Sequence, residues 1–302
     1  MDPLIRGISD TARWVAVYRA RESERPDAVF RDPFARALAG ERGEQILKAM
    51  PFADETTWPF VARTYLFDRS ITRYVKDGAD LVLNLAAGLD TRPYRMDLPP
   101  TLRWVEVDLP EILDYKEEVL ADAKPVCALE RVRLDLSNHD ARRGLFTRLG
   151  REAAKVLVVT EGLLIYLMPD EVCALGRDLA APASFRHWIT DIASPGLIAM
   201  MKQRIGDQVQ QAGAPFLFAP PEGPAFFEAC GWKAIEVKSM LKTARKLNRL
   251  PLFLRRRVQE KGVQNDHTLD LDAIAVEGDS RQHGMYQRAD PDAFSIVSRD
   301  FD

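Results

Sequence analysis

The chain has 302 residues, 46% of them hydrophobic, which is enough to build a sizeable core in one large α/β domain. Its formal net charge of −3 gives no sign of the strong positive field that proteins use to bind nucleic acid or an anionic membrane. No apolar stretch approaches the roughly 20 residues that a membrane-spanning helix needs.

The cysteines and histidines suggest neither disulfides nor a metal. Cys127, Cys173 and Cys230 are odd in number and widely spaced, a pattern typical of a reducing cytoplasm and not of a disulfide framework. The four histidines are far apart, and there is no CxxC or HExxH motif. The N-terminus, MDPLIRGISD, lacks the basic and apolar regions of a signal peptide. We therefore expect a cytoplasmic protein without a metal site.

Residues 1–80 are predicted to form a helical cap. The segment DTARWVAVYRARES opens with Asp10 as a plausible N-cap, and FRDPFARAL starts a helix with Pro33 near its first turn. The segment WPFVARTYLFDRSITRYV repeats apolar residues at helical spacing, which indicates one buried face.

From residue 81 the pattern changes to apolar strands that alternate with helices. Near-continuous apolar strands separated by helices are typical of a parallel sheet covered on both faces. We therefore expect an α/β fold with a doubly wound, mostly parallel, Rossmann-like sheet over residues 81–192. The predicted strands are 81–86, 103–108, 130–135, 155–160 and 184–192, and the predicted helices are 109–123, 138–149 and 169–181.

The C-terminal part is expected to complete one domain of residues 1–302. Residues 193–231 are interpreted as a helical insert, with a helix at 195–213, and a strand is predicted at 232–239. The basic segment 240–261 is predicted to be helical. Residues 262–292 carry no predicted element, and AFSIVSR near the end suggests a last strand, antiparallel to 232–239.

Polar residues follow the ends of four predicted strands. Ligands of doubly wound sheets bind outside the carboxyl ends of the strands, so these residues are candidates for one site. In chain order they are Gly88 and Asp90, then Glu106 and Asp108, then Asp135, then Glu161.

Asp108 follows Gly88 by 20 residues, the spacing at which an acid binds the ribose hydroxyls of an adenosine ligand. The alternative is a capping box, because Glu111 lies three residues further on. The segment AAGLD lacks GxGxxG, and Asp90 would repel a pyrophosphate but tolerate an ammonium and a sulfonium. S-adenosyl-L-methionine is such a ligand and is the expected cofactor, with S-adenosyl-L-homocysteine as product. The alternative for AAGLD is a tight turn that has no role in ligand binding.

The third and fourth strand ends add to this interpretation. Asp135 is suited to the exocyclic amine of adenine, with Leu136 against the ring, although Asp135 could instead start the next helix. Glu161 follows the mainly apolar run VLVVT, and a buried carboxylate needs a partner. That partner would be a positively charged ligand or Arg63 from the cap.

These residues, in this order, resemble the leucine carboxyl methyltransferase family and its large bacterial branch of S-adenosylmethionine-dependent methyltransferases. The resemblance runs from about residue 10 to residue 252 and implies a class I methyltransferase fold. The matching pieces are DTARWVAVYRARES, RDPFA, VARTYLFD, LNLAAGLDTRPYRM, WVEVDLPEIL, LDL, VVTEGLLIYL and ACGWKAIEV…NRLP.

The resemblance implies roles at matching positions. Arg63 resembles the arginine that holds the cofactor carboxylate, and Ala86 with Gly88 would form the turn beside the methionine moiety. Ala86 stands where the family often has glycine. Asp108, Asp135 and Leu136 keep the roles given above, and Glu161 would lie near the transferred methyl. A further basic residue is expected from the first helix, where the candidates are Arg13, Arg19 and Arg21.

The acceptor is expected to be a small molecule, without nucleic acid or membrane as partner. A carboxylate acceptor is ionised at neutral pH and needs no general base, whereas a hydroxyl would benefit from one. Glu161 and His187 are the candidate bases, although His187 lies inside a predicted strand and is expected to be packed there. Tyr94 and Tyr166 are candidates for lining the acceptor pocket, and core packing is nearly as plausible for each.

Three functions are therefore weighed. The first is an O-methyltransferase that acts on a carboxylate or hydroxyl. The second is an NAD-dependent dehydrogenase, against which the missing GxGxxG argues. The third is a regulator that binds an adenosine ligand without catalysis. The sequence leaves open the acceptor, the oligomeric state and the role of residues 262–302.

Overall fold

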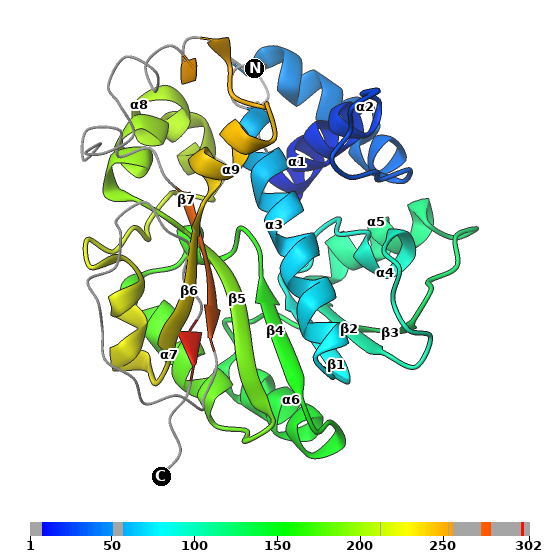
Figure 1. The fold of residues 1–302 in the computed structure, drawn as a ribbon, viewed down its shortest axis with the longest axis vertical. Coiled ribbons are helices and arrows are strands. Elements are labelled where there is room, and N and C mark those ends of the chain that lie inside the picture. The colour runs from blue at the N-terminus through cyan, green and yellow to red at the C-terminus, as the bar shows by residue number, and fades with distance from the viewer. Residues whose placement is uncertain are drawn as a thin grey trace.

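The computed structural model describes residues 8–50, 57–211, 213–252, 254–255, 273–278 and 297–298. It shows a twisted central sheet with helices against both faces and a group of N-terminal helices at one end (Figure 1). The helices of the cap are α1 (Ile8–Ser23), α2 (Ala35–Ala49) and α3 (Thr57–Lys76).

The helical cap is confirmed, with small differences at the helix starts. The helix α1 begins at Ile8, so Asp10 lies inside its first turn and accepts a hydrogen bond from Arg42 at 2.8 Å instead of capping it. The helix α2 begins two residues after Pro33. The apolar face of α3 is buried as its spacing predicts, and α3 runs alongside the sheet (Figure 1).

The five predicted parallel strands are confirmed. Only β3 differs noticeably, because it begins and ends two residues earlier than predicted. The order in the sheet is β3-β2-β1-β4-β5-β7-β6-β8, with β1 and β4 as neighbours at the point where the winding reverses. The strands are β1 (Leu81–Leu85), β2 (Arg103–Asp108), β3 (Ala128–Arg133), β4 (Val156–Thr160) and β5 (Phe185–Ala193).

Alternate residues of the strands enter two separate cores. Leu83 and Val158 pack with α6 (His139–Glu152) and α7 (Pro169–Ala180) on one face. Val82 and Leu157 pack with α3 and α9 (Met240–Lys246) on the other. Both faces of the sheet are therefore buried, which explains why the strands carry nearly continuous apolar runs.

The C-terminal part extends the sheet. The helix α8 (Pro195–Gln211) and the strand β6 (Lys233–Ser239) agree with the predictions. The strand β7 (Ala273–Gly278) lies in the region without a predicted element and pairs antiparallel with both β5 and β6. The strand β8 (Val297–Ser298) pairs antiparallel with β6, as expected for the last strand. The remainder of 256–302 lies outside the described residues.

One expectation about the cysteines is wrong. Cys173 of α7 and Cys230 at the end of the 3-10 helix η2 (Gly223–Cys230) form a disulfide, with Cα atoms 4.9 Å apart. The two residues are 57 positions apart in sequence, so their spacing gave no hint of a pair. They meet because η2 packs against α7, where the indole nitrogen of Trp232 also donates to the carbonyl of Gly176 at 2.7 Å. Cys127 is free and buried.

Among the described residues, no helix combines the length and the apolar character that crossing a membrane requires.

Candidate functional site

A cavity of about 400 Å³ lies where the carboxyl ends of the strands meet the helical cap. It collects most of the predicted site residues, together with side chains of α1, α3, α8 and the loop after α8. The predicted residues on its wall are Arg63, Ala86, Gly88, Asp108, Asp135, Leu136, Glu161 and Tyr166. Within the described ranges, no group of three or more His, Cys, Asp or Glu side chains is arranged to hold a metal ion.

The turn after β1 forms one wall of the cavity. Ala86 and Gly88 both have a positive φ, 52° and 47° respectively, in the left-handed region that non-glycine residues rarely adopt. A Cβ on Gly88 would make only ordinary contacts, the nearest with the Cβ of Ala12 at 3.6 Å. The backbone conformation therefore favours glycine here, and space remains beside the turn for a ligand.

The Asp108 carboxylate ends β2 and is fixed by two backbone groups. It accepts hydrogen bonds from the N–H of Gly88 at 2.6 Å and of Leu109 at 2.8 Å. Burial raises the pKa of Asp108 above its ordinary value, and the two backbone donors oppose that rise. The helix α5 (Pro110–Val119) has Leu109 as its N-cap residue, without a side-chain cap, so the capping-box alternative is not what the structure shows.

Asp135 and Leu136 lie in the loop between β3 and α6. The Asp135 carboxylate is exposed and accepts a hydrogen bond from the N–H of Ser137 at 2.8 Å. Asn138 caps α6, accepting a hydrogen bond from the N–H of Ala141 at 3.1 Å. The alternative in which Asp135 starts the next helix is therefore not observed, and its carboxylate remains at the cavity wall beside the half-buried Leu136.

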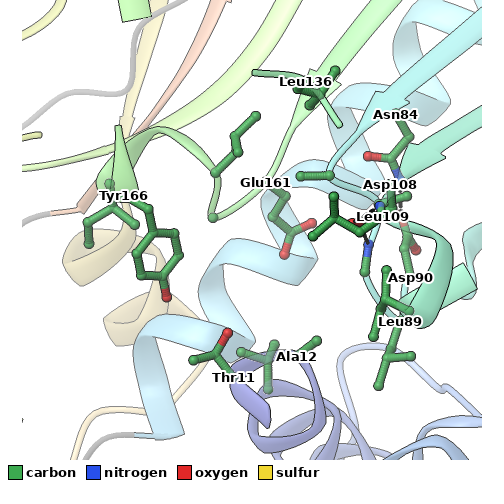
Figure 2. A pocket seen from close by; sticks show the side chains of 18 of the residues that line it. Thr11, Ala12, Asn84, Leu89, Asp90, Asp108, Leu109, Leu136, Glu161 and Tyr166 are labelled. Carbon is green, nitrogen blue, oxygen red and sulfur yellow. Dashed lines mark hydrogen bonds between the residues drawn. The ribbon is translucent and has the colours of Figure 1, made fainter. Parts of the chain in front are cut away.

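Glu161 lies between the two sides of the cavity, with Tyr166 on one side and Asp108 and Asp90 on the other in Figure 2. One carboxylate oxygen pairs with Nε of Arg63 at 3.1 Å and the other with Nη1 of Arg92 at 2.8 Å. The expected partner Arg63 is thus present, and Arg92 is an additional one.

Arg63 also reaches the fifth strand. Its Nη1 donates to Oδ2 of Asp191 at 3.1 Å, and Oδ1 of Asp191 accepts from the N–H of Gly162 at 2.6 Å. Burial disfavours the charge on Arg63, yet Asp191 and Glu161 together raise its pKa. Burial likewise raises the pKa of Asp191. The network joins α3 of the cap to the ends of β4 and β5.

Asp90 belongs to a second part of the same network. It accepts hydrogen bonds from the side chain of Asn84 at 2.8 Å and from Nη1 of Arg92 at 2.9 Å. Burial opposes ionisation of Asp90, but the cations around it, Arg92 foremost, lower its pKa to about 2. The acid at the first turn is therefore a permanent negative charge at neutral pH.

Of the three candidate arginines of the first helix, the structure places one at the cavity. Arg19 lines the cavity and donates to the carbonyl of Leu89 at 2.6 Å and to Asp32 at 2.9 Å. Arg13 instead lies over the ring of Tyr115, 3.6 Å from its centroid. Neither Arg13 nor Arg21 is among the residues that line the described cavity.

The two candidate tyrosines have different surroundings. Tyr166 lines the cavity and stacks on Phe216 with ring centroids 6.0 Å apart. Burial raises its pKa, partly offset by a hydrogen bond with Thr11. Tyr94 is 9% exposed, packs in the core beside α2 and α5, accepts a hydrogen bond from Arg131 at 2.6 Å, and is not among the cavity residues. The expectation that Tyr94 lines the pocket is therefore wrong.

Two further candidates lie elsewhere. His187 is in the middle of β5, 6% exposed, with its ring 4.4 Å from that of Tyr74, so the packing interpretation holds and a role as base does not. Glu106 is fully buried and paired with Lys116 at 2.7 Å and Arg131 at 3.0 Å. It therefore does not assist Asp108 at the cavity.

Sequence reasoning missed Arg92, Asp191 and Asn84, all of which line the cavity. Each had a signal. Asp191 stands near the end of a predicted strand, as the other acids do, but was counted only as part of that strand. Arg92 and Asn84 flank the turn Ala86–Asp90, and a polar residue inside the buried β1 needs a partner.

Two solved structures share the fold of this chain. A DUF574 family protein from Streptomyces avermitilis has a TM-score of 0.58 and 15% identity, covering 89% of this chain and 96% of its own. A Thermobifida fusca protein described as a methyltransferase has a TM-score of 0.56 and 18% identity, covering 93% and 97%. The fold, with a cavity at the carboxyl ends of its strands, is that of class I methyltransferases.

Sequence comparison gives the family. The leucine carboxyl methyltransferase profile matches residues 12–180. A Frankia alni protein named as an S-adenosyl-L-methionine-dependent methyltransferase is 34% identical over 243 residues, covering 76% of this chain and 83% of the relative. A similarly named Streptomyces coelicolor protein is 35% identical over 240 residues, covering 76% and 84%. The chain belongs to the leucine carboxyl methyltransferase family, which confirms the predicted enzyme class and its cofactor, S-adenosyl-L-methionine.

Proposed function

We propose that this protein transfers a methyl group from S-adenosyl-L-methionine to a carboxylate or hydroxyl oxygen of a small acceptor molecule. One observation carries the proposal: the acids of the cavity fall into two groups that differ in their hydrogen-bond partners. Asp90, Glu161 and Asp191 are paired with arginines. The hydrogen-bond donors described at Asp108 and Asp135 are backbone N–H groups. These two acids therefore keep acceptor capacity for a ligand.

The residues present fit the cofactor. A carboxylate offers about four lone-pair positions, and two at Asp108 are used by backbone, so two neighbouring ribose hydroxyls can donate to the rest. Asp135 and Leu136 would hold adenine, and the open space beside Gly88 would admit the methionine part. Arg63 uses Nε and Nη1 for acids, which leaves Nη2 for the cofactor carboxylate.

The turn after β1 argues against the dehydrogenase alternative. A dinucleotide needs backbone N–H groups and no negative charge where its pyrophosphate rests. Here the turn carries Asp90, whose pKa is lowered to about 2. The turn therefore places a carboxylate held by Arg92 and Asn84 where a dinucleotide site would offer unoccupied backbone N–H groups.

The chain contributes alignment and shielding to the reaction. When bound, S-adenosyl-L-methionine supplies an electrophilic methyl group on its sulfonium. Glu161 is held in place by Arg63 and Arg92 and acts through its position and charge, not as a mobile proton acceptor. This favours a carboxylate acceptor, which is already ionised at neutral pH and needs no base.

The partners and location remain part of the proposal. The small net charge supports a small-molecule acceptor in preference to nucleic acid or a membrane. The cytoplasmic location stays a prediction. Because Cys173 and Cys230 form a disulfide, the cysteine pattern no longer supports that prediction.

Calorimetric titration with S-adenosyl-L-methionine, S-adenosyl-L-homocysteine and NAD tests the cofactor site. We expect the first two to bind the wild type and NAD not to bind. The Asp108→Ala variant should bind the first two about tenfold to a hundredfold more weakly, because hydrogen bonds to a charged acceptor are lost. Asp114→Ala is the matched control, since Asp114 is an exposed acid paired with Arg133 outside the cavity.

The outcomes separate the alternatives. Binding of NAD alone, or equal affinities for wild type and Asp108→Ala, would contradict the proposed site. If the cofactor binds as expected, product formation is measured by mass spectrometry with carboxylic acids and with alcohols as acceptors. Methylation of nitrogen or sulfur acceptors only would contradict the proposed O-methylation.

A further inference from the structure

Four aromatic side chains gather on the cap side of the cavity. They come from separate parts of the chain, namely Trp14 of α1, Phe60 of α3, Tyr166 of the 3-10 helix η1 (Leu164–Tyr166) and Phe216 of the loop after α8. All four belong to one apolar cluster that also contains Ile165 and residues of α8. The same cluster brings the cap and the insert together around this end of the cavity.

The rings form two pairs. Trp14 and Phe60 meet edge to face, with centroids 5.5 Å apart. Tyr166 and Phe216 are stacked, with centroids 6.0 Å apart. In Figure 2, Tyr166 lies across Glu161 from Asp108, the residue assigned to the ribose. The aromatic end of the cavity is therefore the end left for the acceptor.

The positive charges of the cavity wall are paired within the protein itself. Every arginine that the structure places on its wall has a carboxylate partner, and among the described residues no lysine lines it. The pairs are Arg19 with Asp32, Arg63 with Glu161 and Asp191, Arg92 with Asp68, Asp90 and Glu161, Arg95 with Asp68, and Arg142 with Asp178. Selectivity at the acceptor end therefore comes mainly from ring contacts.

We propose that the acceptor is an aromatic compound whose ring packs against the four side chains and whose carboxylate or hydroxyl oxygen lies at the end of the rings nearest the Arg63–Glu161 pair. This rests on the proposed methyl transfer. The bond from sulfur to the methyl carbon breaks, its electron pair stays on sulfur, and the acceptor oxygen forms the new bond. A carboxylate reacts without proton loss, whereas a hydroxyl releases its proton to solvent. Ring–ring contacts add about 0.5–1.5 kcal/mol beyond area burial, enough to discriminate flat rings from saturated ones.

Matched probes test this. Benzoate is compared with cyclohexanecarboxylate, and 2-naphthol with decahydro-2-naphthol, so that each pair differs only in ring saturation. Binding to the full chain saturated with S-adenosyl-L-homocysteine is followed by ligand-observed NMR up to about 1 mM, the weakest affinity counted as binding. We expect each aromatic probe to bind at least about threefold to tenfold more tightly than its saturated partner.

Variants locate the binding. Phe216→Leu keeps the apolar volume but removes one ring, and should reduce the aromatic preference about threefold to tenfold. Phe226→Leu is the matched control, because Phe226 is a half-buried aromatic of η2 that is not among the cavity residues. A Trp14→Leu variant gives a second measurement from the opposite pair. The affinity for S-adenosyl-L-homocysteine should remain unchanged in Phe216→Leu and Phe226→Leu.

Each outcome decides a separate point. If S-adenosyl-L-homocysteine binds but saturated probes bind as well as aromatic ones, or no probe binds, the aromatic inference is overturned and the proposed methyl transfer stands. If the aromatic preference is equally strong in wild type and Phe216→Leu, the assigned end of the cavity is wrong. If aromatic probes bind as expected but S-adenosyl-L-homocysteine does not, the ring site stands and the proposed function fails.

Discussion

We predict from the structure that the ion pair between Asp90 and Arg92 stabilises the folded state. Asp90 accepts a hydrogen bond from Arg92 at 2.9 Å, and the Arg92 side chain is only 3% exposed. Burial disfavours a charged Asp90, but Arg92 and further cations lower its pKa from 3.8 to about 2. The folded state therefore binds a proton less readily than the unfolded chain.

The size of the effect follows from linkage. A difference of about 2 pKa units corresponds to about 2–3 kcal/mol of stability, at about 1.4 kcal/mol per unit. Because the folded pKa is depressed, this contribution is fully present above the unfolded pKa near 3.8. It is lost as the pH falls through about 2. Arg92 is the largest of the lowering influences, so we assign at least about 1 kcal/mol at neutral pH to this one pair.

A double-mutant cycle measures the pair directly. Asp90→Asn, Arg92→Met and the double variant are unfolded in urea at pH 7, and the coupling energy is taken from the four free energies of unfolding. We expect at least about 1 kcal/mol. The control cycle uses the exposed pair Asp140 and Arg143 on α6, where about 0.3–0.5 kcal/mol is typical. A coupling at Asp90 no larger than the control would refute the reasoning.

Two further predictions concern the backbone and the disulfide. Replacing Ala86 by glycine should leave the free energy of unfolding unchanged or raise it by up to about 1 kcal/mol in urea denaturation, since φ is positive there. The same change at Ala87, where φ is not positive, should lower it. Alkylation of unfolded, unreduced protein should modify Cys127 alone, and reduction should destabilise the fold by about 4 kcal/mol, because the Cys173–Cys230 bridge closes a loop of 57 residues. Labelling of all three cysteines before reduction would contradict the bridge.

The parallel core could be predicted from the sequence because its signals are local. The strands β1 and β4 are short, fully buried and mainly apolar runs, β2 and β5 carry largely buried interiors, and all five parallel strands, including the more polar edge strand β3, are found within two residues of their predictions. The strand β7 could not be found this way. It is inserted between β5 and β6, which are distant in sequence, and its pairing partners decide its conformation more than its own composition does.

The candidate site was predictable to the extent that strand ends point to one edge. That rule brought Gly88, Asp108, Asp135 and Glu161 to the same cavity. It gave no information on which acids are free to bind a ligand, because that depends on where arginine side chains reach. Arg92 contacts three acids from different elements, and only the folded arrangement reveals this.

The same rule also explains which candidates fail. Tyr94 and Glu106 follow or belong to the first two strands, yet both contact Arg131 of β3 and not the cavity. Glu106 and Asp108 are two residues apart and therefore share one face of β2, so their position along the strand, not their direction, separates them. Glu106 lies inside the strand, where it is fully buried against Lys116 and Arg131. Asp108 is two residues after Glu106 and ends the strand, which places its carboxylate at Gly88.

The network around Glu161 connects the cap to the sheet at the centre of the cavity. Arg63 comes from α3, Arg92 from the short helix α4 (Arg92–Arg95), and Asp191 from β5. Because each guanidinium has carboxylate partners on different elements, moving the cap away from the sheet would separate several charge pairs together, and buried charges left unpaired are costly. The distance between the aromatic side chains of the cap and the Asp108 side of the cavity is therefore held by the same ion pairs. This fixed spacing is what a direct displacement between two bound molecules requires.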